Sequence, residues 1–424
     1  MKILHFNTYD TGGAAQAAWS FHLSLIENGH QSMMMVRNKT RSDAGLIEFK
    51  IEGVLSFLKY KFYKASSNII KTDPGYFFYN YREKFHFPTQ QFVKQLPFTP
   101  DIICVHWVTG FINAQNLYEL SQATGAPIIW RFNDMNAFTG GCHYSNGCTN
   151  YFTTCGKCPA LLSSNPKDRS YENLQEKIKW LSKTNISFLS STTEIDEQLR
   201  NSVLAKFTKT YKIMLGCRQE FFNYQPDKNL YRKELGLPEG KKIIFFGAQN
   251  INDKRKGYTV LLEALHVLKT KITVEASENI LLVYASQFDG VKEEELPFKS
   301  IRLPFMKGEE EIAKLYKIAD VLVSPSIEDA GPMMLLESML CGTPAVTFTV
   351  GLAKDAVINN VNGFIVPTLD VDKFAEGIKQ VLIMEADEYR SFSQNCAEKT
   401  AALFGKEKEI ANYEELFREL VKNK

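Results

Sequence analysis

The chain reads Ser324-Pro-Ser-Ile-Glu-Asp-Ala-Gly-Pro-Met-Met-Leu-Leu-Glu337-Ser-Met-Leu-Cys-Gly-Thr-Pro344 directly after an apolar segment of strand length. Pro332 suits the first position of a helix, and Gly342 and Pro344 mark its end, so we predict a helix from about Pro332 to Cys341. The helix positions three and four residues from Glu337 are all apolar. A carboxylate there needs a hydrogen-bonding partner, because burial without one costs several kcal/mol. The partner is either a ligand hydroxyl or a nearby backbone group.

Asp329 lies in the turn before this predicted helix. Exposed backbone N–H groups at the start of a helix favour anionic or hydroxylated ligands. A strand end, a loop and a helix N-terminus together form the usual ligand crevice of an open parallel sheet. The sequence therefore indicates a binding role for Asp329, with simple capping of the helix as the alternative.

The two acids, the seven residues between them and the following Ser-Met-Leu-Cys-Gly-Thr-Pro resemble the signature of the retaining nucleotide-sugar glycosyltransferases of family 4, which have the GT-B fold. The resemblance implies an α/β protein of two Rossmann-like, doubly wound domains facing an interdomain cleft. It implies that Glu337 binds the nucleotide ribose and that Asp329, where many members have glutamate, contacts the donor sugar. The neighbouring donor-binding residues would be Ala330, Gly331, Pro332 and Met333.

Strand-like and helix-like segments alternate in two successive sets, as two doubly wound sheets require. The first set of predicted strands covers residues 2–6, 32–36, 101–106, 127–132 and 186–190, with a helix over 14–28. The second covers residues 241–247, 280–285, 321–324 and 344–348. We therefore expect one domain over residues 1–222 and a second over 223–404, with the polar stretch 223–240 as the linker. The resemblance implies that the first is the acceptor side and the second the donor domain.

The C-terminal segment, residues 405–424, is predicted to be a helix with an apolar face. That face carries Ile410, Tyr413, Leu416, Phe417 and Leu420. The resemblance implies that this helix crosses back onto the first domain. A surface helix of the second domain is the alternative.

Composition narrows the class of protein. A chain of 424 residues is long enough for two domains of about 200 residues each. A net charge of +2 gives no reason to expect nucleic acid as a partner. The first residues read as a strand and do not form a signal peptide, and no apolar run approaches the roughly 20 residues that span a bilayer. We expect a cytoplasmic protein that is peripheral at the inner face of the membrane if its acceptor is lipid-linked.

Gly12 and Gly13 follow the first predicted strand and precede a helix. Small residues at such a position let backbone N–H groups approach an oxygen-rich ligand. The pair matches the first-domain glycine loop of the resembling enzymes, which faces acceptor or donor phosphate. A tight turn is the alternative interpretation.

A basic loop follows the predicted strand that ends at Gly247. Family members commonly have an arginine after this glycine, but Ala248 occupies that position here, and Arg255 is the nearest replacement. Lys256 matches the family's lysine before a later glycine. The resemblance implies that both cations bind the donor and offset the charge of a departing diphosphate. A solvated basic loop without a ligand is the alternative.

The segment Trp130-Arg-Phe-Asn-Asp-Met-Asn-Ala-Phe-Thr-Gly-Gly-Cys-His-Tyr144 resembles a subgroup segment in which a His-Asp pair stands at Asn133 and Asp134. Asn133 can donate a hydrogen bond but cannot act as an acid–base group. Asp134 holds either a loop or an acceptor hydroxyl. His106, at the end of a neighbouring strand, is a third candidate on the acceptor side of the cleft.

A Cys-rich insertion over residues 140–160 contains Cys142, Cys148, Cys155 and Cys158. In a reducing compartment four thiolates with this spacing can bind tetrahedral zinc. His143 is an alternative ligand. Four cysteines leave zinc no open position, so the metal would be structural and not catalytic. Unliganded thiols or an occasional disulfide are the alternative.

Residues 57–64 are basic, aromatic and free of acids. They suit an anionic membrane that carries a lipid-linked acceptor, or an ordinary amphipathic helix with lysines along its edge.

The leading hypothesis is a retaining glycosyltransferase without a catalytic metal, which moves a sugar from a nucleotide-sugar donor to a hydroxyl of a polysaccharide, lipid-linked or other glycan. A zinc-containing α/β module that binds nucleic acid or protein is the alternative. A dinucleotide-dependent oxidoreductase is excluded, because neither half has a complete Gly-x-Gly-x-x-Gly after a strand.

Overall fold

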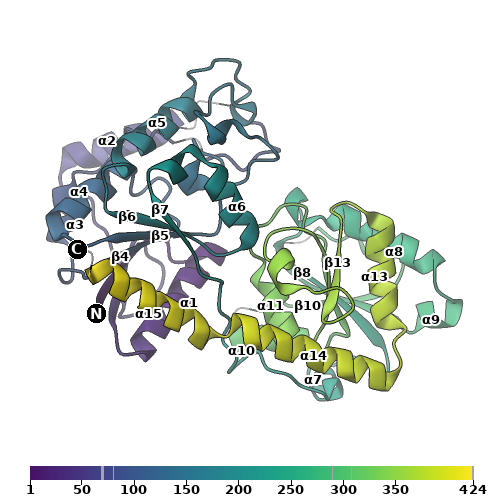
Figure 1. Ribbon diagram of the computed structural model, residues 1–424. Helices are drawn as coiled ribbons and strands as arrows, with labels where there is room; N and C mark the ends of the chain where they lie inside the picture. Colours follow the sequence, from purple (N-terminus) through teal and green to yellow (C-terminus); the bar gives the residue numbers. More distant parts are fainter. Residues whose placement is uncertain (68–70, 80, 289, 307, 423–424) are drawn as a thin grey trace. The chain divides into compact units, whose positions relative to one another are not determined.

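The computed structural model describes residues 1–67, 71–79, 81–288, 290–306 and 308–422. The chain forms two compact units, one made of Met1–Met214 and Ile410–Lys424 and the other of Leu215–Glu409. Each unit contains a parallel sheet with helices on both faces (Figure 1). The predicted pair of Rossmann-like α/β domains is confirmed. The division after Met214 comes earlier than the expected boundary at residue 222.

The first sheet has the strand order β3-β2-β1-β4-β5-β6-β7. Its strands are β1 (Lys2–Tyr9), β2 (Gln31–Asn38), β3 (Leu46–Glu48), β4 (Ile102–Val105), β5 (Ile128–Phe132), β6 (Ile186–Ser190) and β7 (Lys209–Lys212). The connecting helices are α1 (Gly13–Glu27), α2 (Val54–Ser67), α3 (Thr89–Lys94), α4 (Ala114–Thr124), α5 (Arg169–Leu181) and α6 (Thr193–Asn201). The chain runs outward from β1 to β3 and then returns to place β4 beside β1. The carboxyl ends of β1 and β4 therefore flank the topological switch point, where open α/β sheets bind ligands.

The second sheet has the order β10-β9-β8-β11-β12-β13, with its switch point between β8 and β11. Its strands are β8 (Lys242–Asn250), β9 (Ile280–Phe288), β10 (Lys299–Leu303), β11 (Val321–Ser324), β12 (Ala345–Phe348) and β13 (Gly363–Val366). Its helices are α7 (Lys228–Glu234), α8 (Tyr258–Thr270), α9 (Val274–Glu278), α10 (Glu309–Lys317), α11 (Met333–Leu340), α12 (Ala353–Ala356), α13 (Val371–Leu382) and α14 (Ala386–Phe404).

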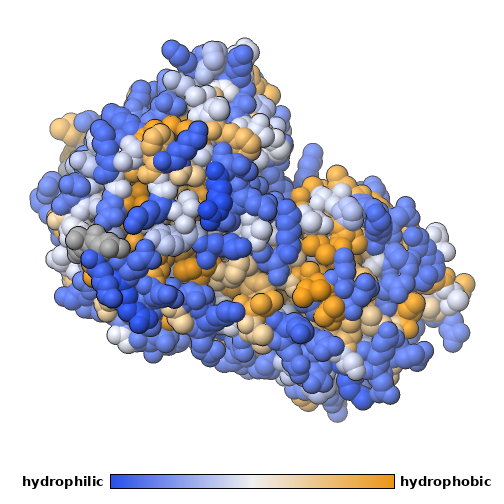
Figure 2. All heavy atoms as spheres, viewed as in Figure 1, coloured by the Kyte–Doolittle hydropathy of each residue, from blue (hydrophilic) through white to orange (hydrophobic). Residues whose placement is uncertain are grey.

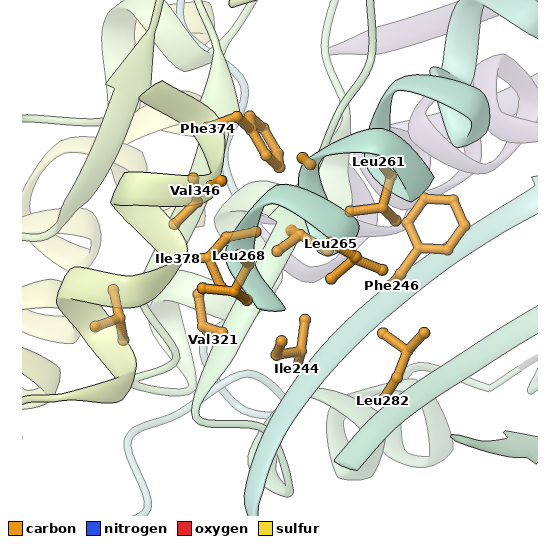
Figure 3. Close-up of a cluster of buried hydrophobic side chains, with 14 of the residues drawn as sticks. Ile244, Phe246, Leu261, Leu265, Leu268, Leu282, Val321, Val346, Phe374 and Ile378 are labelled. Carbon is orange, nitrogen blue, oxygen red and sulfur yellow. The ribbon is translucent and has the colours of Figure 1, made fainter. Parts of the chain in front are cut away.

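The core of the second unit lies between its sheet and the helices α8 and α13. Figure 3 shows Ile244 and Leu282 from the sheet facing Leu265 of α8 and Ile378 of α13. All four side chains are at most 3% exposed. Burial of each such side chain stabilises the fold by about 1.5–3 kcal/mol. This core fixes the strands whose carboxyl ends carry the loops described below.

The stretch expected as a linker, residues 223–240, instead contains α7, which packs into the second unit. Lys228 is buried, and its Nζ donates to the carbonyl oxygen of Ala319 at 2.6 Å. Arg232 is buried in an ion pair with Asp320 at 2.8 Å. The linker interpretation was wrong because polar residues of this stretch are buried, where they form hydrogen bonds and an ion pair with the rest of the second unit.

The C-terminal helix α15 spans Lys406–Lys422. From Ile410 onward the chain belongs to the first unit. The predicted apolar face, including Tyr413 and Phe417, packs with Ile3 and Phe21 in a buried cluster of that unit.

Helix α2 covers the basic, aromatic segment 57–64. No helix in the described ranges is long and apolar enough to cross a membrane. Hydrophilic residues cover most of the visible face of the molecule, with apolar patches between them (Figure 2).

Candidate active site

Two loops meet at the switch point of the second sheet. One follows β8 and contains the short 3-10 helix η5 (Lys254–Lys256), and the other follows β11 and leads into α11. Nζ of Lys256 lies 2.5 Å from Oδ2 of Asp329 in an ion pair. The structure thus brings together two of the three residues that the sequence predicted to be catalytic.

The two loops are joined through their backbones. Gly257 follows Lys256 with φ +70°, and a Cβ added there would lie 1.9 Å from the carbonyl oxygen of Pro325. The amide of Ile327 donates to the carbonyl oxygen of Arg255 at 2.7 Å. Only glycine permits this close approach, which fixes Lys256 next to the loop that carries Asp329.

The carboxylate of Asp329 also organises its own loop. Its Oδ1 accepts a hydrogen bond from the amide of Gly331 at 3.2 Å. Helix α11 begins after Pro332, which takes the N-cap position instead of the predicted first helical position, and no side chain caps the helix. The alternative that Asp329 merely caps α11 is therefore wrong. Of its neighbours, Ala330 and Pro332 are buried, whereas Gly331 and Met333 are partly exposed.

Arg255 pairs with Asp253 in the same loop, with Nη2 2.6 Å from Oδ2. Oδ1 of Asp253 in turn caps η5 at the amide of Arg255. The charge of Arg255 is therefore partly balanced within its own loop. The guanidinium remains partly exposed beside Lys256.

Glu337 lies on α11 and is only partly exposed. Its Oε2 accepts a hydrogen bond from the hydroxyl of Tyr316 on α10 at 2.7 Å. Burial raises the pKa of Glu337 to about 7, against the opposing effect of the Tyr316 hydrogen bond. A ligand hydroxyl that donates to this carboxylate would favour the ionised form.

Sequence reasoning missed Tyr316 and Gly351. Tyr316 is the partner that Glu337 requires, but its distance along the chain gives no signal of the contact. Gly351 has φ +54°, and a Cβ there would lie 2.2 Å from the carbonyl oxygen of Asp329. Only a glycine with positive φ lets the chain pass so close to the Asp329 loop.

The sequence predicted that the strand ends at Gly247, but it does not. β8 continues to Asn250, and Gly247 pairs with Ala285 of β9 within the ladder. The prediction ended the strand too early because polar residues follow Gly247, and these continue the pairing at the exposed end of the sheet.

In the first unit, Asn133, Asp134 and His106 line one pocket of about 40 Å³ at the carboxyl ends of β4 and β5. Oδ2 of Asp134 lies 2.7 Å from Nδ1 of the buried His143, and its Oδ1 accepts from the amide of Asn136 at 2.9 Å. Oδ1 of Asn133 accepts from the hydroxyl of Ser191 at 2.8 Å. Asp134 therefore holds the local loop, one of the two roles that the sequence left open.

His106 is buried, with Nε2 2.9 Å from Nδ1 of His5. Nε2 of His5 is hydrogen-bonded to the hydroxyl of Ser32, which is also hydrogen-bonded to Nδ1 of His22. Burial, assisted by the nearby charge of Arg131, holds the pKa of His106 well below its ordinary value. His106 is therefore a neutral member of a buried histidine chain.

Gly12 caps α1 without a side-chain hydrogen bond and has φ +92°. A Cβ at Gly12 or Gly13 would meet nothing within 4 Å in the part of the chain that the structure describes. The glycine pair therefore faces open space at the end of β1, as a ligand-binding loop requires.

The thiols of Cys142, Cys148, Cys155 and Cys158 all line one small cavity of about 20 Å³. Cys142 donates a hydrogen bond to Cys158 and thereby lowers the pKa of Cys158 to about 7. No group of three or more Cys, His, Asp or Glu side chains within the described ranges is arranged to hold a metal ion. His143 does not line this cavity.

Residues 227–399, most of the second unit, match the model of the family described as glycosyl transferases group 1. Among curated proteins, the chain is similar to the uncharacterized glycosyltransferase MJ1607 of Methanocaldococcus jannaschii, with 29% identity over 37% of this chain and 40% of that protein. The chain thus spans less than half the length of this relative.

Two solved structures resemble the whole chain. Sucrose-phosphate synthase of Thermosynechococcus elongatus has 16% sequence identity and a TM-score of 0.68, and the alignment covers 100% of both chains. Alr3699/HepE of Anabaena in complex with UDP-glucose has 14% identity and a TM-score of 0.63, again with 100% of both chains covered.

The chain has the GT-B fold of glycosyltransferases.

Proposed function

We propose that this protein is a glycosyltransferase that moves a sugar from a nucleotide-sugar donor to a hydroxyl of a glycan acceptor. The ion pair between Lys256 and Asp329, inside the matched family domain, is the observation that carries the proposal. The UDP-glucose complex of the structurally similar HepE supports a nucleotide sugar as the donor.

On the donor side, Lys256 together with Arg255 stabilises the departing diphosphate. Glu337 accepts hydrogen bonds from the ribose hydroxyls. Asp329 and the amide of Gly331 hold the sugar. Preorganised charges of this kind stabilise the charge that develops in the transition state, because they need no rearrangement during the reaction.

The proposed reaction retains the anomeric configuration of the donor and uses no catalytic metal. Its support is the spacing of Asp329 and Glu337 and the two cations, Arg255 and Lys256, in the loop after β8. The two cations and the helix-end amides neutralise the diphosphate instead.

The acceptor is a polysaccharide, a lipid-linked glycan or another glycan, and we propose that helix α2 contacts an anionic membrane. Val54, Leu55 and Phe62 of this helix are at least 75% exposed. Lys59, Lys61 and Lys64 lie among such apolar side chains, and the helix has no acidic residue. This pattern complements anionic lipids and repels a second copy of itself through like charges.

We also propose a structural zinc ion in the Cys-rich insertion. The cavity shared by the four thiols supports it, although the thiols must first move into a tetrahedral arrangement. Elemental analysis of protein purified without added metal should find about one zinc per chain. Substoichiometric metal together with four freely titrating thiols would rule it out.

A panel of UDP, GDP and ADP sugars tests the donor proposal by thermal shift, with RNA and DNA as controls. Stabilisation by at least one nucleotide sugar, and by neither nucleic acid, is expected. Binding of RNA or DNA without any response to nucleotide sugars would favour the alternative interaction module. Neither the family match nor the fold gives that alternative any support.

A further inference from the structure

A second pocket of the first unit, which we name the Arg37 pocket, lies at the carboxyl ends of β1 and β2 and beside the segment after β4. Thr8 and Tyr9 from β1, Arg37 and Asn38 from β2, and Thr109 line it on the side of the sheet. Its volume is about 590 Å³. This position flanks the switch point of the sheet, where an open α/β sheet binds its ligands.

The lining of the Arg37 pocket is positively charged. Arg37 and Lys64 both line it, and none of the described lining residues carries a carboxylate. The guanidinium of Arg37 stacks on Tyr60, with its central carbon 5.0 Å from the ring centre. The buried Nε of Arg37 has no hydrogen-bond partner among the described residues. Arg37 as a whole is partly exposed and lines the pocket, so the remaining N–H groups of its guanidinium can donate to an anionic ligand there.

Tyrosines form much of the remaining wall. Tyr60 and Tyr63 come from α2, and Tyr79 and Tyr81 come from the segment that follows it. Burial raises the pKa of Tyr63 and Tyr81 above the ordinary value, so their hydroxyls stay protonated. The hydroxyl of Tyr81 is already hydrogen-bonded to Glu83. The tyrosine rings provide flat apolar surfaces for a sugar.

We infer that the Arg37 pocket binds a phosphate group carried by the acceptor, with Arg37 as its main contact and Lys64 as an additional cation. A planar guanidinium can bind phosphate through two parallel hydrogen bonds. The assignment of the phosphate to the acceptor rests on the function proposed above. Phosphate binding by the pocket does not depend on that function.

Helix α2 connects this pocket with the outer surface of the unit. Its residues Tyr60, Tyr63 and Lys64 line the pocket, while Leu55 and Phe62 point into solvent. A phosphate in this pocket can therefore belong to a soluble phosphate ester or to the head group of a lipid held at α2. Both sources share the same recognition chemistry.

Isothermal titration calorimetry of the full chain tests the inference with two probes. The soluble probe is glucose 1-phosphate, with glucose as its uncharged control, and the lipid probe is dihexanoyl phosphatidic acid below its critical micelle concentration. The wild-type protein should bind at least one phosphate probe and should not bind glucose with comparable affinity. Binding of both probes supports the inference and shows that the pocket accepts a phosphate from a soluble ester or from a lipid. Binding of the lipid probe alone supports the inference and identifies a lipid head group as the source. Failure of both probes to bind overturns the inference.

Variants locate the bound phosphate. Arg37→Gln should weaken binding at least about tenfold, and Arg37→Lys should keep part of the affinity because it preserves the charge. Arg41→Gln is the matched control, because Arg41 lies over Trp19 and pairs with Asp43 outside the pocket. Equal affinity of the wild type and Arg37→Gln would overturn the inference. A loss caused only by Lys256→Ala would also overturn it, because the phosphate would then bind in the second unit.

This experiment separates the two proposals. If no nucleotide sugar binds but Arg37-dependent phosphate binding persists, the donor proposal fails and the pocket assignment stands. If nucleotide sugars bind and Arg37→Gln has no effect on phosphate binding, the pocket assignment fails alone.

Discussion

The carboxylate of Asp329 forms an ion pair with Lys256, with Oδ2 2.5 Å from Nζ. Both groups remain partly exposed. In the reaction proposed above, the donor diphosphate replaces Asp329 as the partner of Lys256, and the carboxylate of Asp329 then accepts a hydrogen bond from a sugar hydroxyl. Arg255 pairs with Asp253 of its own loop, whereas the partner of Lys256 comes from the loop after β11.

Lys256→Ala and Glu337→Gln should each reduce the rate of transfer at least about tenfold, or about 1.4 kcal/mol in the barrier, while the protein remains folded. Steady-state kinetics with the best donor of the panel measures the effect. Lys254→Ala is the matched control, because Lys254 is an exposed lysine of the same short helix. Near wild-type turnover in both folded variants would remove these two residues from the mechanism.

Nucleotide binding should depend on the ionisation of Glu337. Because its pKa lies at about 7, affinity for a nucleoside diphosphate should rise as the pH increases from about 6 to about 8, by up to about tenfold. Glu337→Gln should remove this rise when binding is measured by calorimetry across the range. An equal rise in the variant would assign the pH dependence to another group.

Without added nucleotide, the contribution of Glu337 to the free energy of unfolding should decrease as the pH increases, whereas affinity for the nucleotide increases. The folded pKa of Glu337, about 7, lies above its ordinary value of 4.5. Its contribution to the free energy of unfolding is therefore present below pH 4.5 and is lost as the pH rises through about 7.

For single residues, the sequence predicted which side chains belong to the candidate site but not which partners they contact. The separation between Asp329 and Glu337 and the Lys256-Gly257 pair are local patterns that can be read from one chain. The contacts of Glu337 with Tyr316 and of Asp134 with His143 depend on how helices and loops pack. The neutrality of His106 likewise arises from burial among other histidines, which its own segment does not reveal.

Among the elements, the central strands were predicted and the outermost strands were not. The strands that the sequence reading missed are β3, β7, β10 and β13, and each lies at an edge of its sheet. Central parallel strands are covered on both faces and read as apolar runs. Edge strands such as β7, with the sequence Lys-Thr-Tyr-Lys and no fully buried residue, lack that signal.

The contact between the two donor-side loops should depend on Gly257. Gly257→Ala introduces a Cβ against the carbonyl oxygen of Pro325 and strains a backbone with φ +70°. We expect a loss of about 2–3 kcal/mol in stability together with loss of donor binding. Gly236→Ala is the matched control, because Gly236 has φ +67° but open space around its Cβ position. Equal shifts in melting temperature for the two variants would contradict the close packing of the loops.

Helix α2 should bind anionic vesicles. The full chain should sediment with phosphatidylglycerol vesicles and much less with phosphatidylcholine vesicles. Phe62→Ser should weaken that binding several-fold, because the side chain of Phe62 is 77% exposed. Leu230→Ser removes a 58% exposed apolar side chain from α7 and should have no effect. Equal sedimentation of the wild type and Phe62→Ser would exclude α2 as the membrane contact, and a change of oligomeric state instead would identify a second copy as its partner.

For the whole molecule, the repeated alternation of strand-like and helix-like segments was enough to predict two Rossmann-like domains. The family match covers residues 227–399 and therefore supports the donor side most directly. The first unit lies outside that match, and its proposed role as the acceptor side rests on its pockets. Which acceptor it takes depends on loops and exposed faces, where no local pattern fixes the ligand.

The most direct test of the account is a proton NMR time course of the reaction between the best nucleotide-sugar donor and a glycan acceptor, in the presence of EDTA. The account predicts release of the nucleoside diphosphate and a product with the anomeric configuration of the donor, at an early rate equal to that without chelator. A product of inverted configuration would contradict the retaining mechanism. Immediate loss of activity that magnesium or manganese restores would contradict a site in which Lys256 and Arg255 neutralise the diphosphate.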